Sequence, residues 1–280
     1  MLPETRSLEL SHDARGVLHV TLAREHLYNA VNAAMLSELT AVFGAIHAMD
    51  DVRVVVLRGK GGHFSSGGDL GELTAAITAR GDGADDALAD MIRDSGRLLS
   101  LIDRSPKLVI SVLEGVVLGT GLGMACVSDM VIAHAGAELS LPEVTIGFPP
   151  SQIAPFLLRR IGVSGTRMLA LTARRFDGRE AHRLGLAHVV TDDVGQLPDL
   201  VEQVVGDALR CGPAAVAATK DMLRDLEPGD LERFLDGAAR RFVEELRREE
   251  GAEGVAAFLA RRAPGWSPQA SGEVRRKRHG

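Results

Sequence analysis

The chain has 280 residues, of which 45% are hydrophobic and 25% are charged, and its formal net charge is −6 at pH 7. These values are typical of a globular protein and exclude a disordered or fibrous chain. The acidic balance and the aromatic content of 4% argue against a nucleic-acid-binding protein, which needs a basic face and aromatic stacking platforms.

The two cysteines, Cys126 and Cys211, predict neither a disulfide framework nor a metal site, because no CxxC or Cys/His spacing typical of zinc occurs. We interpret them as small hydrophobic side chains in a reducing compartment. Residues 1–6 lack the apolar stretch of a secretory signal, and no apolar run approaches the ~20 residues of a membrane span. The sequence therefore predicts a cytoplasmic protein without a membrane segment or a bound metal.

Strand and helix patterns alternate over the first two-thirds of the chain. Aliphatic and β-branched runs predict short strands, and apolar residues at helical spacing predict helices. The expected strands are residues 17–22, 52–57, 108–113, 131–133 and 139–141. The expected helices are residues 29–49, which Asn29 or Asn32 could cap, and one that ends near Ile102. Small and acidic residues at 81–86 predict a mobile surface loop, and Gly136 predicts a turn between the last two strands.

Helical patterns dominate from residue 151 onward. The expected elements are helices at 153–161, 165–172, 197–209, 231–249 and 253–262, a short helix capped by Asp177, a helix that begins at Pro213, and a strand at 188–191. We therefore predict an α/β core at residues 1–205, a helical region at 206–265 and a disordered basic tail at 266–280.

Two glycine-rich segments, residues 61–70 and 115–123, each follow an expected strand. Neither contains a P-loop or a nucleophile elbow. Glycines 119, 121 and 123 have the spacing G-x-G-x-G instead of the dinucleotide fingerprint G-x-G-x-x-G, although Glu138 and Glu143 lie at about the right distance for a ribose contact. Either segment alone could be a tight turn used for packing.

Together, the two segments could bring backbone N–H groups to one oxygen and form an oxyanion hole, which stabilises charge that develops on a carbonyl. Glu143 follows in an apolar stretch beside Leu141 and Val144. Burial there would raise its pKa and make it a usable general acid or base. The alternative is a surface glutamate in a loop.

Five segments in chain order carry a more specific pattern. The first is Leu22-Ala23-Arg24 with Tyr28-Asn29-Ala30-Val31-Asn32, which follows R-P-x-x-x-N-A-x-N with Glu25 in place of proline. The second and third are residues 63–70 (F-x-[AS]-G-x-D-[IL]) and residues 114–129 (N-G-x-x-x-G-G-G, then Asp). The last two are residues 141–149 (P-E-x-x-x-G-x-x-P) and residues 250–266 (E-G-x-x-A-F-x-x-[KR]-x-P-x-[WF]). On these segments, which span nearly the whole chain, the sequence resembles the crotonase superfamily, the enoyl-CoA hydratase/isomerase family.

The resemblance implies a role for each matched residue. The N–H groups of Gly68 and Thr120 would form the oxyanion hole for an acyl-CoA thioester, and Glu143 would be the catalytic carboxylate. Asp69 is expected to cap a helix and not to catalyse. The residues expected along the CoA are Arg24 near its phosphates, Ser66, Gly67, Gly68, Asp69, Leu70 and Thr120 beside its body, and Phe258 with Arg261 or Arg262 over the CoA of a neighbouring subunit.

The implied fold is α/β, a spiral of βαβ units with a helical C-terminal trimerisation region, assembled as a homotrimer or dimer of trimers. The implied partner is an acyl-CoA substrate, with no separate cofactor, no nucleic acid and no membrane.

Two positions depart from the family pattern. Thr120 replaces the middle glycine of the triple glycine, and Gly123 replaces the first of two hydratase glutamates. A single glutamate resembles isomerases and also hydratases of branched 3-methylglutaconyl-type thioesters. Residues 147–156 resemble that branched-substrate group, including isohexenylglutaconyl-CoA hydratases.

The sequence therefore predicts an enoyl-CoA hydratase that uses one glutamate. A Δ3-Δ2 enoyl-CoA isomerase and a non-catalytic acyl-CoA-binding protein remain as alternatives. The acyl pocket is expected within residues 73–101. The histidines at 63, 134, 182 and 188 show no pairing logic and are interpreted as structural or surface residues.

Overall fold

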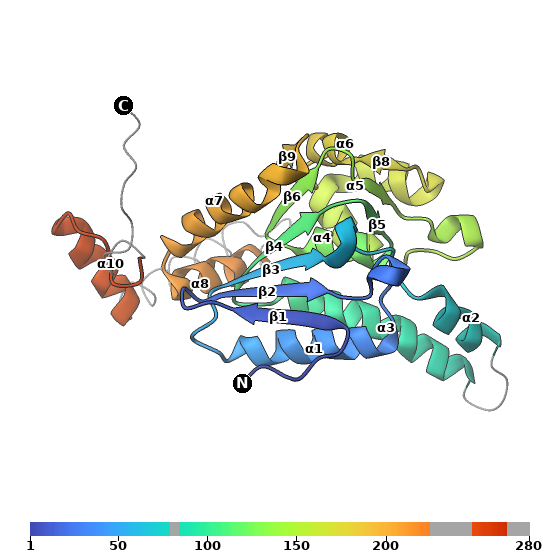
Figure 1. The fold of residues 1–280 in the computed structure, drawn as a ribbon, viewed down its shortest axis with the longest axis horizontal. Coiled ribbons are helices and arrows are strands. Elements are labelled where there is room, and N and C mark those ends of the chain that lie inside the picture. Colours follow the sequence, from blue (N-terminus) through green and yellow to red (C-terminus); the bar gives the residue numbers. More distant parts are fainter. Residues whose placement is uncertain (79–83, 225–247, 268–280) are drawn as a thin grey trace, which may run out of the picture.

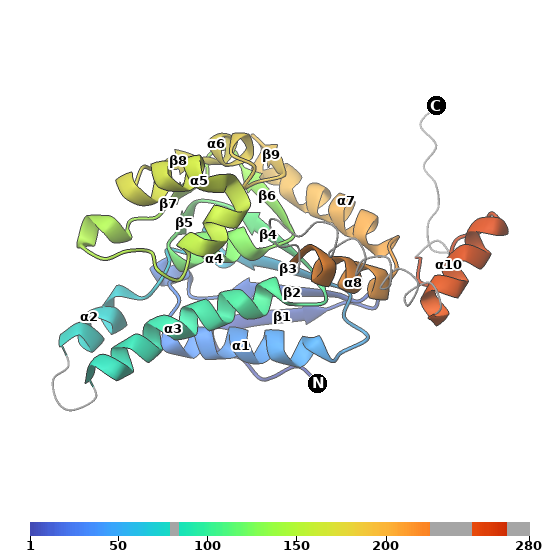
Figure 2. The same ribbon diagram turned by 180° about the vertical axis from the view of Figure 1, so that it is seen from behind.

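The computed structural model describes residues 1–78, 84–224 and 248–267, which form two sheets and the helices around them (Figures 1 and 2). The central sheet has six strands in the order β1-β2-β3-β4-β6-β9; β1 pairs antiparallel with β2, and the other neighbours are parallel. Its strands are β1 (Leu8–His12), β2 (Val17–Leu22), β3 (Val54–Gly59), β4 (Leu108–Leu113), β6 (Met130–His134) and β9 (Val189–Thr191). Because β3 and β4 are parallel neighbours, the glycine-rich segments that follow them leave the same edge of the sheet.

A second sheet of three short strands stands beside this edge. It has the order β5-β7-β8 and consists of β5 (Val116–Leu118), β7 (Glu138–Ser140) and β8 (Phe176–Asp177). The strand β5 lies within the second glycine-rich segment, so this sheet fixes the course of that segment.

Helices cover both faces of the central sheet. The helices are α1 (Ala33–His47), α2 (Leu70–Thr78), α3 (Ala84–Asp103), α4 (Thr120–Val127), α5 (Ala154–Thr172), α6 (Gly178–Arg183), α7 (Leu197–Leu209), α8 (Pro213–Arg224) and α10 (Glu249–Leu259). Side chains alternate along β3 in the manner of a strand buried on both faces. Val55 and Leu57 join the large core with α1, α3 and α4, whereas Val54 and Val56 pack with α7.

Several sequence predictions are confirmed in detail. β2, β4 and α7 have the expected bounds, and α8 begins at Pro213. Of the two candidate caps of α1, Asn32 is the one used, because its side chain accepts a hydrogen bond from the N–H of Met35 at 3.0 Å. Asp177 caps α6 in the same way.

Other elements differ from the expectation. β1, β5 and β8 were not predicted, since strands of two to five residues carry little periodicity. The two helices expected at 153–161 and 165–172 form the single element α5, which is interrupted at Gly162 with φ +74°. The boundary proposed after residue 205 falls inside α7, where Val205 and Leu209 pack in one cluster. Of the loop expected at 81–86, residues 84–86 instead begin α3. Residues 81–83, residues 231–247 of the helix expected at 231–249 and the tail from 268 lie outside the described residues.

No helix in the described ranges combines the length and apolar character needed to cross a bilayer. The same ranges bring together no group of three or more metal-ligating side chains.

Candidate active site

The first glycine-rich segment runs between the N-terminal segment and β5. Ser65 donates its N–H to Val116 O at 3.0 Å, and Leu118 donates to Ser65 O at 2.9 Å. On the other side, Val31 donates to Gly67 O at 2.7 Å and accepts from the N–H of Asp69 at 3.0 Å. The backbone around Gly68 is therefore held by a neighbour on each side.

The two glycine-rich segments touch through their backbones. Gly67 has φ +90°, and a Cβ there would lie 2.9 Å from Leu118 O. Gly119 has φ +48°, and a Cβ there would lie 3.7 Å from Gly67 Cα. Only glycine permits this conformation and this approach, so the two segments meet as expected, while their joint hold on one oxygen stays a prediction.

Two N–H groups are left free where the segments meet. Within the described ranges, no protein acceptor receives a hydrogen bond from the N–H of Gly68 or of Thr120. Thr120 is the first residue of α4, where a helix has no internal acceptor for its N–H groups. Gly68 is exposed, whereas Thr120 is buried. Such donors at a helix start are able to bind an oxygen that carries partial negative charge.

Glu143 brings a carboxylate to the same place. It begins a short 3-10 helix after β7, and a Cβ at Gly119 would lie only 3.0 Å from its Oε1. Its Oε2 is buried and has no hydrogen-bond partner among the described residues. Burial raises the pKa of Glu143 above its usual value of 4.5. A partly buried carboxylate with one unpaired oxygen, beside free donors, is typical of a group used in catalysis.

The wall next to these groups is apolar. Gly123 lies one turn beyond Gly119 in α4 and donates its N–H to Gly119 O at 2.9 Å. A Cβ at Gly123 would lie 2.9 Å from Leu99 Cδ1 and 3.3 Å from Ile153 Cγ1. Both side chains are buried, so this position has no space for a second carboxylate. Leu99 lies in the stretch expected to line the acyl pocket and Ile153 in the segment 147–156, but nothing in the sequence indicates that they pack against Gly123.

Adding a methyl group at Gly123 tests this close packing. We expect Gly123→Ala to lower the free energy of unfolding by about 1–3 kcal/mol through overpacking, and Gly123→Glu by more, because it also buries a charge. Gly206→Ala in α7 is the matched control, since a Cβ there meets nothing within 4 Å. Melting temperatures at equal protein concentration measure the difference. Equal melting of Gly123→Ala and Gly206→Ala would contradict the packing argument.

The remaining predicted residues of the first segment are placed as follows. The Ser66 hydroxyl donates to Leu27 O at 3.0 Å, and Leu70 is 63% exposed. The Asp69 carboxylate accepts from the N–H groups of Gly71 at 3.0 Å and Glu72 at 3.4 Å, which confirms it as the cap of α2.

Arg24 is directed into the protein. Its guanidinium donates to Ala30 O at 2.6 Å and to Asp69 Oδ2 at 3.0 Å. Burial favours a raised pKa for Asp69, but the hydrogen bonds from Arg24, Glu72 and Gly71 outweigh it and hold the pKa below its usual value.

The C-terminal residues lie elsewhere. The helix α10 contacts α8 at one end of the molecule, whereas α2 lies at the opposite end (Figure 1). Arg261 follows α10, is exposed and has φ +52°. The side chain of Phe258 is outside the described residues. Within one chain, Arg261 is therefore not gathered with Glu143, and its contact with a neighbouring subunit stays a prediction.

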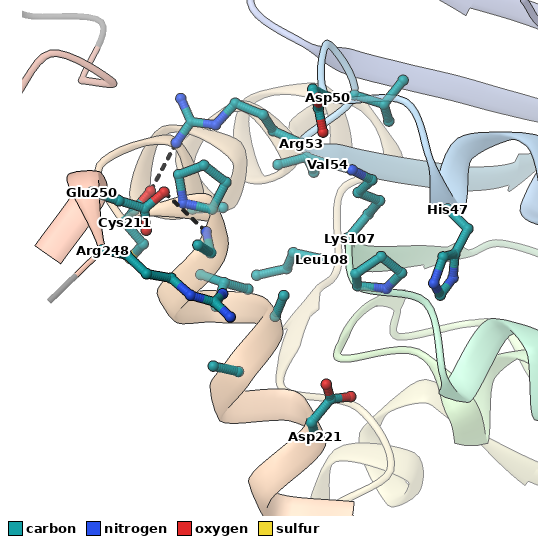
Figure 3. Close-up of a pocket in the computed structure, with 18 residues that line it drawn as sticks. His47, Asp50, Arg53, Val54, Lys107, Leu108, Cys211, Asp221, Arg248 and Glu250 are labelled. Atoms are coloured by element: carbon teal, nitrogen blue, oxygen red, sulfur yellow. Dashed lines mark hydrogen bonds between the residues drawn. The ribbon is translucent and has the colours of Figure 1, made fainter. Parts of the chain in front are cut away.

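A cavity of about 660 Å³ opens beside α8 and α10, at the amino ends of β3 and β4 (Figure 3). Its polar groups hold the C-terminal helices together. Glu250 accepts from the N–H of Ala214 at 3.0 Å, and Arg53 donates to Cys211 O at 2.8 Å. The glycine-rich segments leave the carboxyl ends of the same strands, so the cavity is separate from the catalytic cluster.

The four histidines have structural contacts, as expected. His63 Nδ1 accepts from Val116 N–H at 3.1 Å, and His188 Nδ1 accepts from Val131 N–H at 2.9 Å. The rings of His134 and His182 each lie within hydrogen-bond distance of a backbone carbonyl.

Comparison with known proteins gives a consistent result. The family model described as "Enoyl-CoA hydratase/isomerase" matches residues 12–269. The chain is 45% identical to the solved structure of Pseudomonas aeruginosa AtuE, with a TM-score of 0.88 over 94% of this chain and 100% of that one. It is 39% identical to the structure of an enoyl-CoA hydratase/isomerase from Marinobacter aquaeolei, also with a TM-score of 0.88, over 93% and 98%. "Enoyl-CoA hydratase ACTT6" of Alternaria alternata is 32% identical over 245 residues, which cover 87% of this chain and 78% of that protein.

Proposed function

Because the chain belongs to the enoyl-CoA hydratase/isomerase family, we propose that it is a hydratase that adds water across the α,β double bond of a 2-enoyl-CoA. The observation that carries the proposal is the buried and unpaired Oε2 of Glu143 beside the free N–H groups of Gly68 and Thr120. At the carboxyl ends of parallel strands, two N–H donors can hold the carbonyl oxygen of a thioester while a carboxylate moves the protons of water addition.

The proposed reaction begins with the carbonyl oxygen of the thioester. The N–H groups of Gly68 and Thr120 hydrogen-bond this oxygen and draw electron density from the double bond, so that Cβ becomes electrophilic. Water then attacks Cβ while Glu143 takes its proton. The enolate that forms is stabilised by the same two N–H groups.

Glu143 next returns a proton to Cα, which completes the addition of one water molecule. Since Gly123 packs against Leu99 and Ile153, no second carboxylate at this position takes part in either proton transfer. One carboxyl group therefore serves both steps, and the oxygen and the hydrogen are added to the same face of the double bond.

The further details of the proposal follow from the family. The substrate is an acyl-CoA with a straight or branched acyl group, and no cofactor is required. Ser66, Gly67, Leu70 and Thr120 lie beside the CoA, and Phe258 and Arg261 cover the CoA of a neighbouring copy in a homotrimer or a dimer of trimers. The free thiols of Cys126 and Cys211 fit a cytoplasmic protein.

Incubation in water enriched in ¹⁸O tests the proposal. The purified chain is mixed with a panel of straight-chain and branched 2-enoyl-CoAs, and the products are analysed by mass spectrometry. We expect at least one substrate to gain one labelled water molecule, and Glu143→Gln to gain far less. The best substrate identifies the acyl group.

An isomerase is the second candidate, since moving a proton between Cα and Cγ needs only one carboxylate and Glu143 is the one present. Conversion of 3-enoyl-CoAs without gain of water would favour it over the hydratase. Binding of every thioester with no turnover, and no hydrogen exchange at Cα, would contradict both and indicate an acyl-CoA-binding protein.

A further inference from the structure

We propose that Arg24 is a positioning residue for the oxyanion hole, which acts through Asp69 and Ala30 on the peptide of Gly68 and does not bind the phosphates of CoA. This inference rests on the proposed function for its kinetic consequences, but its structural part concerns the protein alone.

The first observation is that the Arg24 guanidinium is already engaged. One terminal nitrogen donates to Ala30 O at 2.6 Å and the other to Asp69 Oδ2 at 3.0 Å. The side chains of Arg24 and Asp69 are only 16% and 17% exposed. An ion pair with little solvent around it is screened less than a surface pair, so Asp69 competes with any phosphate for this cation.

The second observation is where the two acceptors of Arg24 lie. Ala30 and Asp69 belong to the two chain segments that pair through the backbone of Val31. Ala30 precedes Val31, which donates to Gly67 O at 2.7 Å and accepts from Asp69 N–H at 3.0 Å. Asp69 directly follows Gly68. The guanidinium therefore joins these two segments next to the peptide whose N–H is free.

The third observation is that the backbone of Arg24 is fixed as well. Its N–H donates to Asn29 Oδ1 at 3.0 Å, and its carbonyl accepts from Asn29 N–H at 3.0 Å. The buried Asn29 side chain also donates to Lys60 O and His63 O at 2.9 and 2.7 Å, on the loop that leads to Gly68. Tyr28 and Asn29 have φ of +50° and +57°, a conformation that L-residues hold only where the surroundings determine it.

These contacts give Arg24 a consequence for the reaction. A donor of an oxyanion hole must keep its position to within about 0.5 Å, and a displacement of about 1 Å can cost about 10²-fold in rate. Without Arg24, the Asp69 carboxylate and the Ala30 carbonyl both lose a partner. The turn that orients the Gly68 N–H then keeps its backbone bonds and the bonds of the Ser65 and Ser66 hydroxyls, but it loses its only ion pair among the described residues.

Kinetics with two thioesters separate positioning from phosphate binding. The full 2-enoyl-CoA is compared with the matching 2-enoyl-pantetheine thioester, which lacks the phosphorylated adenosine and the pyrophosphate. For Arg24→Met we expect kcat to fall by about 10–100-fold for both thioesters alike, with KM changed less than about threefold. A phosphate ligand would instead raise KM for the CoA thioester and leave the pantetheine thioester unaffected, and that result would overturn the proposal.

Two controls accompany this variant. Lys60→Met removes an exposed cation of the same region, whose side chain pairs with Glu9 and Glu25, and should leave kcat unchanged. The double variant Arg24→Met/Asp69→Asn should be no slower than the slower single variant, because both changes break the same ion pair.

Hydrogen exchange followed by mass spectrometry tests the positioning without a substrate. Amides of residues 67–72 should exchange faster in Arg24→Met than in wild type, and not in Lys60→Met. Unchanged exchange would overturn the inference even for an active hydratase. Faster exchange in a chain that hydrates no thioester would support the positioning and contradict only the proposed function.

Discussion

Replacing Glu143 by glutamine is expected to lower kcat for hydration by a factor on the order of 10²–10⁴, because the amide can neither take the proton from water nor return it to Cα. The two N–H groups and the substrate-binding surface stay in place, so KM should change little. Steady-state kinetics with the best 2-enoyl-CoA measure the effect. A Glu143→Gln protein with undiminished activity would contradict the proposed mechanism.

The same substitution is expected to stabilise the fold at neutral and alkaline pH. Burial raises the pKa of Glu143 in the folded chain, whereas the unfolded carboxyl ionises near 4.5. The folded state therefore binds this proton more tightly, and holding the ionised form is unfavourable above the raised pKa. The penalty grows as pH rises through the window between the two pKa values, and it is absent below about 4.5.

Glutamine carries no charge, so the variant should melt at a higher temperature than wild type at pH 8. The difference should vanish as the pH falls below the pKa of the unfolded carboxyl. Wild-type kcat/KM should fall on the acid side for the related reason that water addition needs the carboxylate form. A Glu143→Gln protein that is less stable than wild type at pH 8 would show that the carboxylate has a structural partner.

The second large effect is expected at Gly119. Alanine there would place a Cβ 3.0 Å from Glu143 Oε1 in a backbone conformation, with φ +48° and ψ −119°, that L-residues avoid. The carboxylate and the neighbouring N–H of Thr120 should both be displaced, and we expect kcat/KM to fall on the order of 10²–10³-fold.

Gly44→Ala provides the matched control for Gly119→Ala, because a Cβ at Gly44 in α1 meets nothing within 4 Å. It should keep full activity and gain about 0.4–1 kcal/mol of stability. Kinetics and melting curves of both variants separate a local effect from unfolding. If Gly119→Ala were as active as Gly44→Ala, the second segment would not take part in catalysis.

Much of the site could be predicted because its parts depend on the course of the backbone, which glycines and apolar runs indicate in the sequence. Two glycine-rich segments after neighbouring strands indicate convergence at one edge of a sheet, and an apolar stretch around Glu143 indicates a buried carboxylate. In the structure the segments meet at one edge of the sheet, and Glu143 is partly buried, with its Oε2 out of contact with solvent. α7 was predicted with its observed bounds because its four buried residues, Leu197, Val201, Val205 and Leu209, recur every four positions.

The rest depends on side chains that meet from distant parts of the chain. Arg24 was expected near phosphates, and nothing local shows that its guanidinium reaches Asp69 across 45 residues. The contact of Gly123 with Leu99 and Ile153 likewise joins three separate segments. β5 is only three residues long, so its sequence pattern cannot be told from that of a loop, although its backbone holds the first glycine-rich segment in place.

The groups proposed to hold the carbonyl oxygen belong to the main chain, and this has a consequence for how such a site changes during evolution. A substitution replaces side chains but leaves an N–H group in place at every residue except proline. Thr120 can therefore vary while the carbonyl is still polarised in the same way, whereas a carboxylate at Gly123 also needs smaller side chains in place of Leu99 and Ile153. New reactions can arise by exchanging the side chains around these N–H groups, provided that the glycines that bring the two segments together are retained.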